Sequence, residues 1–493
     1  MKNLNNAVLP SLPTEVAVPR YDRSALRTGI VHFGVGHFHR AHQARYLDEL
    51  MRAGTAMDWA ILGAGVRPDD ADIRDALDAQ DHLYTLTVKE SDGTRRSRVI
   101  GSLNGYRYAA DSPAGLVASI ADPTTRVVGL TITEGGYGIN PATGEFTGES
   151  EDIQADLGDG APDRTPFGLV LQAMRLRRDQ GVGGLTIMSC DNIQHNGRVA
   201  RAAFLGFAER KDPRLALWMT ENLAFPNSMV DRVTPGTTDA DRAYLERTYG
   251  YRDRWPVTCE PFCQWVLEDT FVAGRPPLED AGVDIVSDVE PYELMKLRLA
   301  NGTHQALCYF GHLLGHRYVH QAIADPDIHA LLLRYIGEAA PTLLPIPGVD
   351  PYAYGRTVIE RFGNPEIRDA LSRICAETSD RIPKFLLPVV TEQLRLGGPV
   401  AQCAAVVAGW ARYAEGVDEQ GQPIDVVDPR REALMTAARK QDTNPTAFIE
   451  DRSVFGDLSR SRVFVEAYVD ALNRIRTRGA RVALRELARG VTA

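Results

Sequence analysis

Three side chains that could transfer a proton or stabilise an oxyanion lie close together in the second half of the chain. Lys296, Asn301 and His304 occur in one helically periodic segment. At about 100° per residue, Asn301 falls about 140° and His304 about 80° from Lys296, so the three share one broad face of the predicted helix. A lysine whose pKa is lowered by burial or nearby positive charge can accept the proton of an alcohol, and asparagine and histidine can donate hydrogen bonds to its oxygen. The segment therefore suits alcohol oxidation, with a solvated lysine and a structural histidine as the alternative.

A glycine-rich turn near the N-terminus is the second candidate for chemistry. Gly34 and Gly36 follow an apolar run and precede a predicted helix. Glycine lets the backbone turn tightly and approach a dinucleotide pyrophosphate, to which the helix N-terminus offers free N–H groups. His39 replaces the third glycine of the usual fingerprint. The pattern indicates a nucleotide loop, with a turn that serves only strand-to-helix packing as the alternative.

Two carboxylates come shortly after the second predicted strand. Asp69 and Asp70 stand where an acidic residue binds the ribose hydroxyls in a dinucleotide-binding unit. Two negative charges disfavour a 2′-phosphate, so we expect NAD rather than NADP, although Arg67 points the other way. A solvated turn over residues 68–70 is the alternative.

These residues require strands and helices that alternate along the first part of the chain. Short apolar runs predict buried parallel strands, and stretches between them have helical periodicity. The alternation predicts an α/β fold with a parallel, Rossmann-type dinucleotide-binding sheet. The predicted strands are 29–34, 59–63, 126–133, 185–189 and 282–287, and the predicted helices include 38–53 and 167–178.

The pattern changes near Asp288-Val289-Glu290, after which strand signals become scarce. Long helical periodicity replaces them, so we expect a mainly α-helical C-terminal domain. The predicted domains are residues 1–288, a Rossmann-type domain with extensions, and residues 289–493, a helical substrate and catalytic domain. The predicted helical segments are 292–314, 328–340, 399–414 and 463–476.

Composition narrows the classes of function. The 493 residues are 44% hydrophobic and carry a formal net charge of −10, which argues against nucleic acid or an anionic membrane as a partner. We see no apolar run of about 18 residues and no signal-peptide pattern, and therefore expect a cytoplasmic protein. The six cysteines are dispersed without a CxxC pair, so reduced buried thiols and no metal site are expected.

Five segments taken together resemble the polyol-specific long-chain dehydrogenases and reductases, the mannitol dehydrogenase family. The resemblance covers most of the chain and implies a Rossmann-type N-terminal domain and a largely helical C-terminal domain with the site between them. The segments are Gly34-Val35-Gly36-His37-Phe38-His39-Arg40-Ala41-His42-Gln43, Thr131-Ile132-Thr133-Glu134-Gly135-Gly136-Tyr137, Ser189-Cys190-Asp191-Asn192, Phe225-Pro226-Asn227-Ser228-Met229-Val230-Asp231-Arg232 and Lys296 through His304.

The resemblance implies a role for each candidate residue. Lys296 would be the general acid/base, and Asn301 and His304 would polarise the reacting oxygen with help from Asn192. Asp231 would bind substrate hydroxyls. The cofactor-binding residues would be Gly34, Gly36, Phe38, His39, Arg40, Asp69, Asp70 and Glu134, the last beside the nicotinamide and the proton path; a carboxylate that only caps a strand-end turn is the alternative for Glu134.

A further basic segment, Thr378-Ser379-Asp380-Arg381-Ile382-Pro383-Lys384-Phe385, resembles the mannitol-type members rather than those that reduce uronates. Arg381 and Lys384 are therefore candidates for the substrate pocket. The alternative is that they only pair with acidic neighbours such as Asp380.

The predicted reaction is the reversible, metal-independent oxidation of D-mannitol to D-fructose with NAD, and the resemblance implies a monomer. The nearest alternatives are D-arabinitol or a hexuronate as the substrate of the same chemistry. A zinc alcohol dehydrogenase finds no support, because the cysteines and histidines form no ligand cluster. A non-catalytic NAD-binding sensor is the alternative of another class, and a sensor would have no use for the base Lys296.

Overall fold

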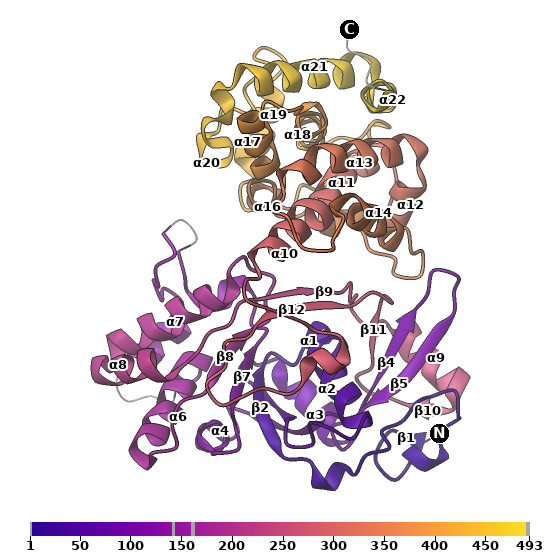
Figure 1. Ribbon diagram of the computed structural model, residues 1–493. Coiled ribbons are helices and arrows are strands. Elements are labelled where there is room, and N and C mark those ends of the chain that lie inside the picture. The colour runs from indigo at the N-terminus through magenta and orange to yellow at the C-terminus, as the bar shows by residue number, and fades with distance from the viewer. Residues whose placement is uncertain (1, 141–142, 159–162, 490–493) are drawn as a thin grey trace. The chain divides into compact units, whose positions relative to one another are not determined.

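The computed structural model describes residues 2–140, 143–158 and 163–489. Internal contacts divide the chain into two compact units, Met1–Glu290 and Pro291–Ala493. The division falls two residues after the boundary expected at 288. Each unit is described by itself below (Figure 1).

The N-terminal unit is built on a five-stranded parallel sheet with the order β6-β3-β2-β7-β8. All its strand pairs are parallel, and nearly every residue in the three middle strands is buried. This confirms the predicted parallel α/β sheet. From β2 the chain adds β3 and β6 on one side and then returns to add β7 and β8 on the other side. The direction of the strand order therefore reverses between β2 and β7. The strands are β2 (Thr28–Phe33), β3 (Ala60–Gly65), β6 (Leu103–Tyr108), β7 (Val127–Leu130) and β8 (Thr186–Ser189).

Helices connect these strands and pack apolar side chains against the sheet. Phe167 and Val170 of α6 belong to one buried cluster, and Tyr46 and Leu47 of α2 belong to another that includes Ile61 of β3. The helices of this unit are α1 (His37–Ala41), α2 (Gln43–Arg52), α3 (Asp70–Asp78), α4 (Pro113–Ala121), α5 (Glu151–Leu157), α6 (Pro166–Gln180), α7 (Asn196–Lys211), α8 (Pro213–Asn222) and α9 (Asp239–Tyr249).

The prediction of one helix over 38–53 is wrong, because the backbone breaks at His42, where φ is −118° and ψ is −90°. Carbonyls that would continue the helix bond elsewhere. The Tyr84 hydroxyl donates to the Arg40 carbonyl at 2.6 Å, and the Arg232 guanidinium donates to the Ala41 carbonyl at 2.6 Å. Two side chains distant in sequence therefore end α1 after five residues.

Smaller sheets surround the central one. The predicted strand 282–287 forms as β13, but it lies in a separate three-stranded sheet, β13-β12-β9, in which β9 runs antiparallel to β12. The outer strands are β1 (Lys2–Asn3), β4 (Tyr84–Lys89), β5 (Arg95–Ile100), β9 (Ser228–Asp231), β10 (Tyr251–Arg252), β11 (Val257–Cys259), β12 (Gln264–Glu268) and β13 (Asp284–Val286).

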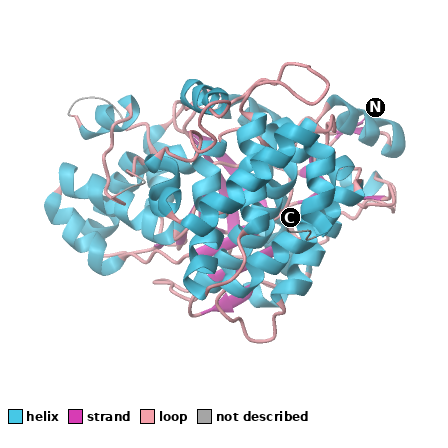
Figure 2. Ribbon diagram, turned by 90° about the horizontal axis from the view of Figure 1, so that it is seen from above, coloured by secondary structure: helices cyan, strands magenta, loops and turns pink. Residues whose placement is uncertain are grey.

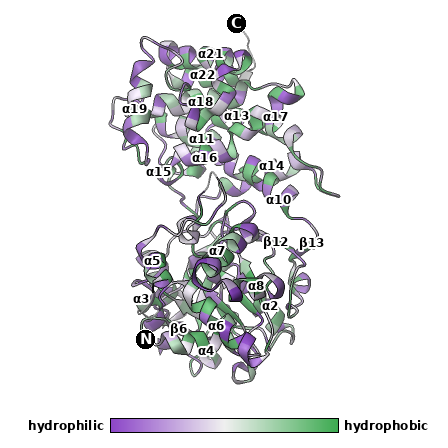
Figure 3. Cartoon of the chain, turned by 90° about the vertical axis from the view of Figure 1, so that its left-hand side faces the viewer, coloured by the Kyte–Doolittle hydropathy of each residue, from purple (hydrophilic) through white to green (hydrophobic). Residues whose placement is uncertain are grey.

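The described residues of the C-terminal unit form helices joined by loops and turns (helices are cyan in Figure 2). Its described residues contain isolated β-bridges but no named strand. Its core is one large cluster around α11 and α18, whose residues are mostly hydrophobic (green in Figure 3). The helices are α10 (Glu290–Met295), α11 (Gly302–Leu313), α12 (Val319–Ala324), α13 (Pro326–Ala339), α14 (Pro351–Phe362), α15 (Leu371–Ile374), α16 (Thr378–Phe385), α17 (Leu387–Leu396), α18 (Ala401–Tyr413), α19 (Arg431–Lys440), α20 (Arg452–Phe455), α21 (Arg462–Arg478) and α22 (Ala480–Arg489).

The four predicted helical segments all form, with one difference in the first. Between α10 and α11 the chain is not α-helical: residues Lys296–Asn301 form a π-helix, η5. Short 3₁₀ turns occur elsewhere, at η1 (Leu9–Ser11), η2 (Arg23–Ala25), η3 (Glu134–Tyr137), η4 (Leu278–Ala281), η6 (Ala340–Thr342) and η7 (Gly456–Arg460).

Two general features bear on the class of protein. Among the helices within the described residues, none combines the length and hydrophobicity needed to cross a membrane. All six cysteines are free, and Cys263 is the one that is partly exposed.

Candidate active site

Three predicted site residues of the N-terminal unit, two for the cofactor and one for catalysis, lie in loops that follow the carboxyl ends of neighbouring strands. Gly34 follows β2, Glu134 follows β7 and Asn192 follows β8. Because these strands are parallel, the three loops leave the sheet at the same edge. The gap between β2 and β7 is the point where the strand order reverses, which is where doubly wound sheets bind ligands.

Gly34 is required by a close backbone approach. Its φ is +86°, and a Cβ at this position would lie 2.1 Å from the Thr131 carbonyl oxygen. The Thr131 hydroxyl donates to the Gly34 carbonyl at 2.6 Å, so the two loops are bonded as well as close. Only glycine fits this turn.

Gly36 differs from Gly34, because the space around it is open. A Cβ at Gly36 would have its nearest heavy atom 3.9 Å away, and the φ of −80° at this position suits any residue. The protein's own packing therefore does not require glycine at position 36. An open backbone at the switch point fits a pyrophosphate that approaches closely.

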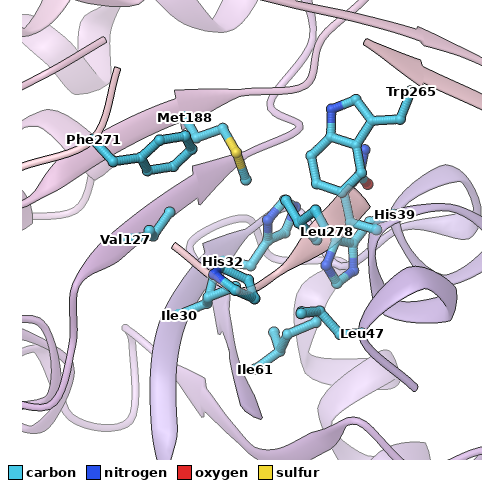
Figure 4. Close-up of a pocket in the computed structure, with 12 residues that line it drawn as sticks. Ile30, His32, His39, Leu47, Ile61, Val127, Met188, Trp265, Phe271 and Leu278 are labelled. Atoms are coloured by element: carbon cyan, nitrogen blue, oxygen red, sulfur yellow. The ribbon is translucent and has the colours of Figure 1, made fainter. Parts of the chain in front are cut away.

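His39, at the position of the usual third glycine, is buried below the loop. Its ring stacks on that of His32, with centroids 3.7 Å apart, and burial lowers the pKa of His39 well below its ordinary value. Within the described residues neither ring nitrogen has a hydrogen-bond partner. The pair borders a cavity of about 20 Å³ whose walls include Gln43, Met188 and Trp265 (Figure 4). His39 thus packs in the interior, next to the glycine turn, and is not exposed on the surface of the loop.

Arg40 is also buried and bonds to the backbone. Its guanidinium donates to the carbonyls of Gly36, at 3.3 Å, and of Trp255, and it lies over the Tyr84 ring. Burial lowers the pKa of Arg40 to about 10. Phe38 is only partly buried and stacks on His42 with ring centroids 4.9 Å apart.

The two carboxylates after β3 have different surroundings. Asp69 is exposed and makes no capping bond to α3. Asp70 is half-buried, and one of its oxygens accepts hydrogen bonds from the backbone N–H groups of Val66 and Arg67, both at 2.8 Å. Asp70 therefore shapes the turn, while Asp69 faces solvent.

A buried carboxylate that sequence reasoning missed as a site residue holds the Glu134 loop. Asp191 accepts hydrogen bonds from the backbone N–H groups of Ile132, at 3.0 Å, and Thr133, at 2.8 Å, and from the Tyr137 hydroxyl at 2.6 Å. Burial raises the pKa of Asp191. Asp191 lies inside the segment Ser189–Asn192, one of the five that resemble the family, and this position was the sequence signal that could have identified it.

Asp191 stabilises a strained backbone. Thr133 has φ +68° and ψ 163°, a conformation that non-glycine residues rarely adopt and that clusters at functional sites. The strained residue directly precedes Glu134, which is exposed on η3, and Asn192 is exposed next to Asp191. One carboxylate thus positions the segments of both predicted residues.

Asp231 ends β9 and pairs with Gln264 of β12. It is 9% exposed. The loop before β9 is fixed by Asn227, whose side chain accepts from the Gly197 N–H at 3.0 Å and donates to Glu268 at 3.0 Å. The resembling segment 225–232 therefore ends on a well-supported, nearly buried carboxylate.

The π-helix changes the geometry expected for Lys296, Asn301 and His304. In a π-helix residues five apart are bonded along the axis, so Lys296 and Asn301 fall on one side of η5. The angle of about 140° predicted from α-helical periodicity does not apply there. Lys296 is 8% exposed, and Glu293 of α10, missed by the sequence reasoning, is buried three residues earlier.

His304 is the third residue of α11 and is half-buried. Its ring stacks on Phe362, the last residue of α14, with centroids 3.6 Å apart and ring planes 7° apart. This contact fixes the plane of the imidazole. The structure thus brings Lys296, Asn301 and His304 together on one helical stretch.

The two basic candidates of α16 form local ion pairs. Lys384 bonds to Asp380 at 2.8 Å, and Arg381 bonds to Glu377 at 3.3 Å and to the carbonyls of Arg373 and Ile374. Pairing with acidic neighbours is the alternative that the sequence left open beside a role in the substrate pocket. Within the described residues, no group of three or more His, Cys, Asp or Glu side chains is arranged to hold a metal ion.

Two family models together match most of the chain. The mannitol dehydrogenase Rossmann domain matches residues 28–280, and the mannitol dehydrogenase C-terminal domain matches residues 288–476. The chain belongs to the mannitol dehydrogenase family. This confirms the resemblance inferred from the five segments.

Curated relatives and solved structures agree with the family. A mannitol 2-dehydrogenase of Phaeosphaeria nodorum is 43% identical over 98% of this chain and 85% of its own length, and one of Aspergillus fumigatus is 45% identical over 93% of each. The Pseudomonas fluorescens mannitol 2-dehydrogenase, solved with NAD and D-mannitol, is 41% identical with a TM-score of 0.88 over all of both chains. A substrate-free D-sorbitol dehydrogenase is 36% identical with a TM-score of 0.90 over 98% of this chain and 100% of its own.

Proposed function

We propose that this protein is an NAD-dependent polyol 2-dehydrogenase that interconverts D-mannitol and D-fructose. The observation that carries the proposal is the grouping of Lys296, Asn301 and His304 on one helical stretch of a family member. The trio supplies a base and two hydrogen-bond donors, which is what the oxidation of a secondary alcohol needs.

Lys296 is the general base in this proposal. It is nearly buried, and as an uncharged amine it can accept the hydroxyl proton. Asn301 and His304 donate hydrogen bonds to the same oxygen as it gains negative charge. In the reverse direction the protonated Lys296 returns the proton to that oxygen.

The residues after β2 and β3 fit a dinucleotide, as the open backbone at Gly36 indicates. NAD supplies the hydride acceptor when bound. We propose that Gly34, Gly36, Phe38 and Asp69 face the cofactor, with Glu134 near its nicotinamide. His39, Arg40 and Asp70 shape the loops from inside.

Asn192 and Asp231 are proposed to bind the reacting oxygen and the substrate hydroxyls. Arg381 would join them only by giving up Glu377 and the carbonyls of Arg373 and Ile374, and Lys384 only by giving up Asp380. An exchange of ion-pair partners costs little for Lys384, which is exposed.

Lys296→Ala is the test of the proposed chemistry. Mannitol oxidation should fall by at least 10²-fold, the usual contribution of general base catalysis, while the affinity for NADH stays within about twofold. Steady-state kinetics and NADH fluorescence titration measure the two quantities. A variant that oxidises mannitol at a rate near that of the wild type would show that Lys296 is not the base.

D-Sorbitol is a second candidate substrate, because the D-sorbitol dehydrogenase structure is as similar in fold as the mannitol enzyme. The two hexitols differ only in configuration at one carbon. Initial rates on D-mannitol, D-sorbitol and D-arabinitol, and on fructuronate with NADH, rank the alternatives. A higher kcat/KM on any of the others would replace mannitol in the proposal.

The remaining expectations concern the setting of the reaction. We propose a monomer that acts in the cytoplasm without a catalytic metal. The six free cysteines suit a reducing compartment, and a lysine base needs no metal-bound water. Undiminished activity after exhaustive chelation and a monomeric mass in light scattering would support this setting.

A further inference from the structure

The π-helical turn η5 has a partner that acts on its backbone. The Gly302 N–H donates to the carbonyl of Leu297, five residues back, and to that of Leu299, three residues back. In an α-helix the same N–H would donate to the carbonyl of Arg298. The Arg298 carbonyl instead accepts a hydrogen bond from the Tyr335 hydroxyl at 2.6 Å.

Tyr335 reaches this carbonyl because Gly302 has no side chain. A Cβ at Gly302 would lie 1.9 Å from the Tyr335 hydroxyl oxygen and 2.9 Å from the ring carbon that carries it. Tyr335 is fully buried in α13, so its hydroxyl needs an acceptor. The Arg298 guanidinium donates to the Thr342 carbonyl, so the side chain of Arg298 is held as well as its backbone carbonyl.

We propose that Tyr335 is a positioning residue that selects the π-helical over the α-helical form of residues 296–301. Its hydroxyl replaces the donor that Arg298 would have in an α-helix. The π form places Asn301 on the same side as Lys296; the α form would rotate it about 140° away. This inference rests on the proposed function, because it assigns Tyr335 the alignment of Lys296 and Asn301.

Tyr335→Phe is the central variant, and Tyr468→Phe is its matched control. Tyr468 is equally buried, and its hydroxyl bonds to Gln441, between α19 and α21. For Tyr335→Phe we expect kcat for mannitol oxidation to fall about tenfold, the equivalent of one ordinary hydrogen bond. The KM for NAD should change less than twofold. The pH dependence of kcat should shift, because Lys296 is misaligned.

The control Tyr468→Phe should lower the melting temperature about as much as Tyr335→Phe does. It should leave kcat and the pH dependence of kcat unchanged.

Gly302→Ala provides a second route to the same turn. The added methyl displaces the Tyr335 hydroxyl, so kcat should fall at least as far as in Tyr335→Phe. The double variant should lose no more activity than the worse single variant, since both remove the same bond. Additive losses would overturn the proposal.

The outcomes separate this inference from the proposed function. If Lys296→Ala is inactive but Tyr335→Phe, folded by circular dichroism, keeps the kcat and pH profile of the wild type, the positioning role is wrong and the proposed chemistry stands. The positioning role is also wrong if Tyr468→Phe reduces kcat as much as Tyr335→Phe does. If Lys296→Ala is active, the proposed chemistry fails, and the positioning role fails with it.

Discussion

The glycine loop of the N-terminal unit and the π-helical turn of the C-terminal unit both depend on a glycine, but the two glycines face different neighbours. A Cβ at Gly34 would meet the backbone carbonyl of Thr131 at 2.1 Å, and φ there is +86°. A Cβ at Gly302 would meet the end of the Tyr335 side chain at 1.9 Å, and φ there is −62°. The glycine loop is therefore fixed by main chain, and the π-helical turn by one side chain.

The groups that hold the two regions also differ in their response to pH. Asp191, which holds the Glu134 loop, is a carboxyl whose pKa is raised by burial from its ordinary value of 3.8. Tyr335 is a phenol whose pKa burial raises well above its ordinary value of 10.0, so it stays protonated at every working pH. The Glu134 loop is thus held by a group that can titrate, while the π-helical turn depends on a single neutral hydroxyl.

Gly34→Ala is expected to have the largest effect on stability. The left-handed backbone costs about 1–2 kcal/mol for alanine, and the clash with Thr131 adds about 1–3 kcal/mol, so the free energy of unfolding should fall by about 2–5 kcal/mol. Urea denaturation measures the loss. Gly302→Ala should cost less when Tyr335 is also Phe, whereas no side-chain substitution should rescue Gly34→Ala. Rescue of Gly34→Ala by Thr131→Ala would contradict the main-chain explanation.

The pH dependence of stability should distinguish Asp191 from Tyr335. Because the pKa of Asp191 is higher in the folded than in the unfolded protein, the folded state binds more protons between the two values. The free energy of unfolding therefore falls as pH rises from about 3.8 through the raised pKa. Asp191→Asn should remove this contribution, and Tyr335→Phe should retain it.

Urea titrations at several pH values, with each variant subtracted from the wild type, isolate the contribution of Asp191 from those of other carboxyls. The effect is expected to be smaller than that of Gly34→Ala. A difference between wild type and Asp191→Asn that does not change with pH would mean that Asp191 does not titrate in this window.

Local patterns predicted the parts of the molecule that depend on local forces. Apolar runs located the central strands, and helical periodicity located the long helices of the C-terminal unit, because burial sets both periods. Spacing alone grouped Lys296, Asn301 and His304. Membership of the family, predicted from five segments, is shown by the two matching models.

The features that the sequence did not reveal depend on distant partners. The π form of residues 296–301 involves Tyr335, 37 residues from Arg298. The break at His42 depends on Tyr84 and on Arg232, 191 residues from Ala41. No local window contains such pairs, so periodicity predicted uninterrupted α-helix at both places.

Gly36→Ala is expected to have the smallest effect on stability, and it tests the cofactor side of the comparison directly. The added methyl meets no heavy atom closer than 3.9 Å, and the φ of −80° suits alanine. The free energy of unfolding should stay the same or rise by up to about 1 kcal/mol, because the unfolded chain loses freedom. If the open backbone is where the pyrophosphate approaches, the same methyl should weaken NADH binding by at least about tenfold.

Gly337→Ala in α13 is the matched control, since a Cβ there meets nothing within 4 Å and one at Gly36 has only the Gly34 carbonyl oxygen at 3.9 Å. It should stabilise the helix by about 0.5–1 kcal/mol and leave the NADH affinity unchanged. NADH fluorescence titration of the two variants compares them at equal stability. Because neither methyl disturbs the packing, a loss of affinity confined to Gly36→Ala can only come from the ligand side. Equal affinities in both variants would place the pyrophosphate away from Gly36.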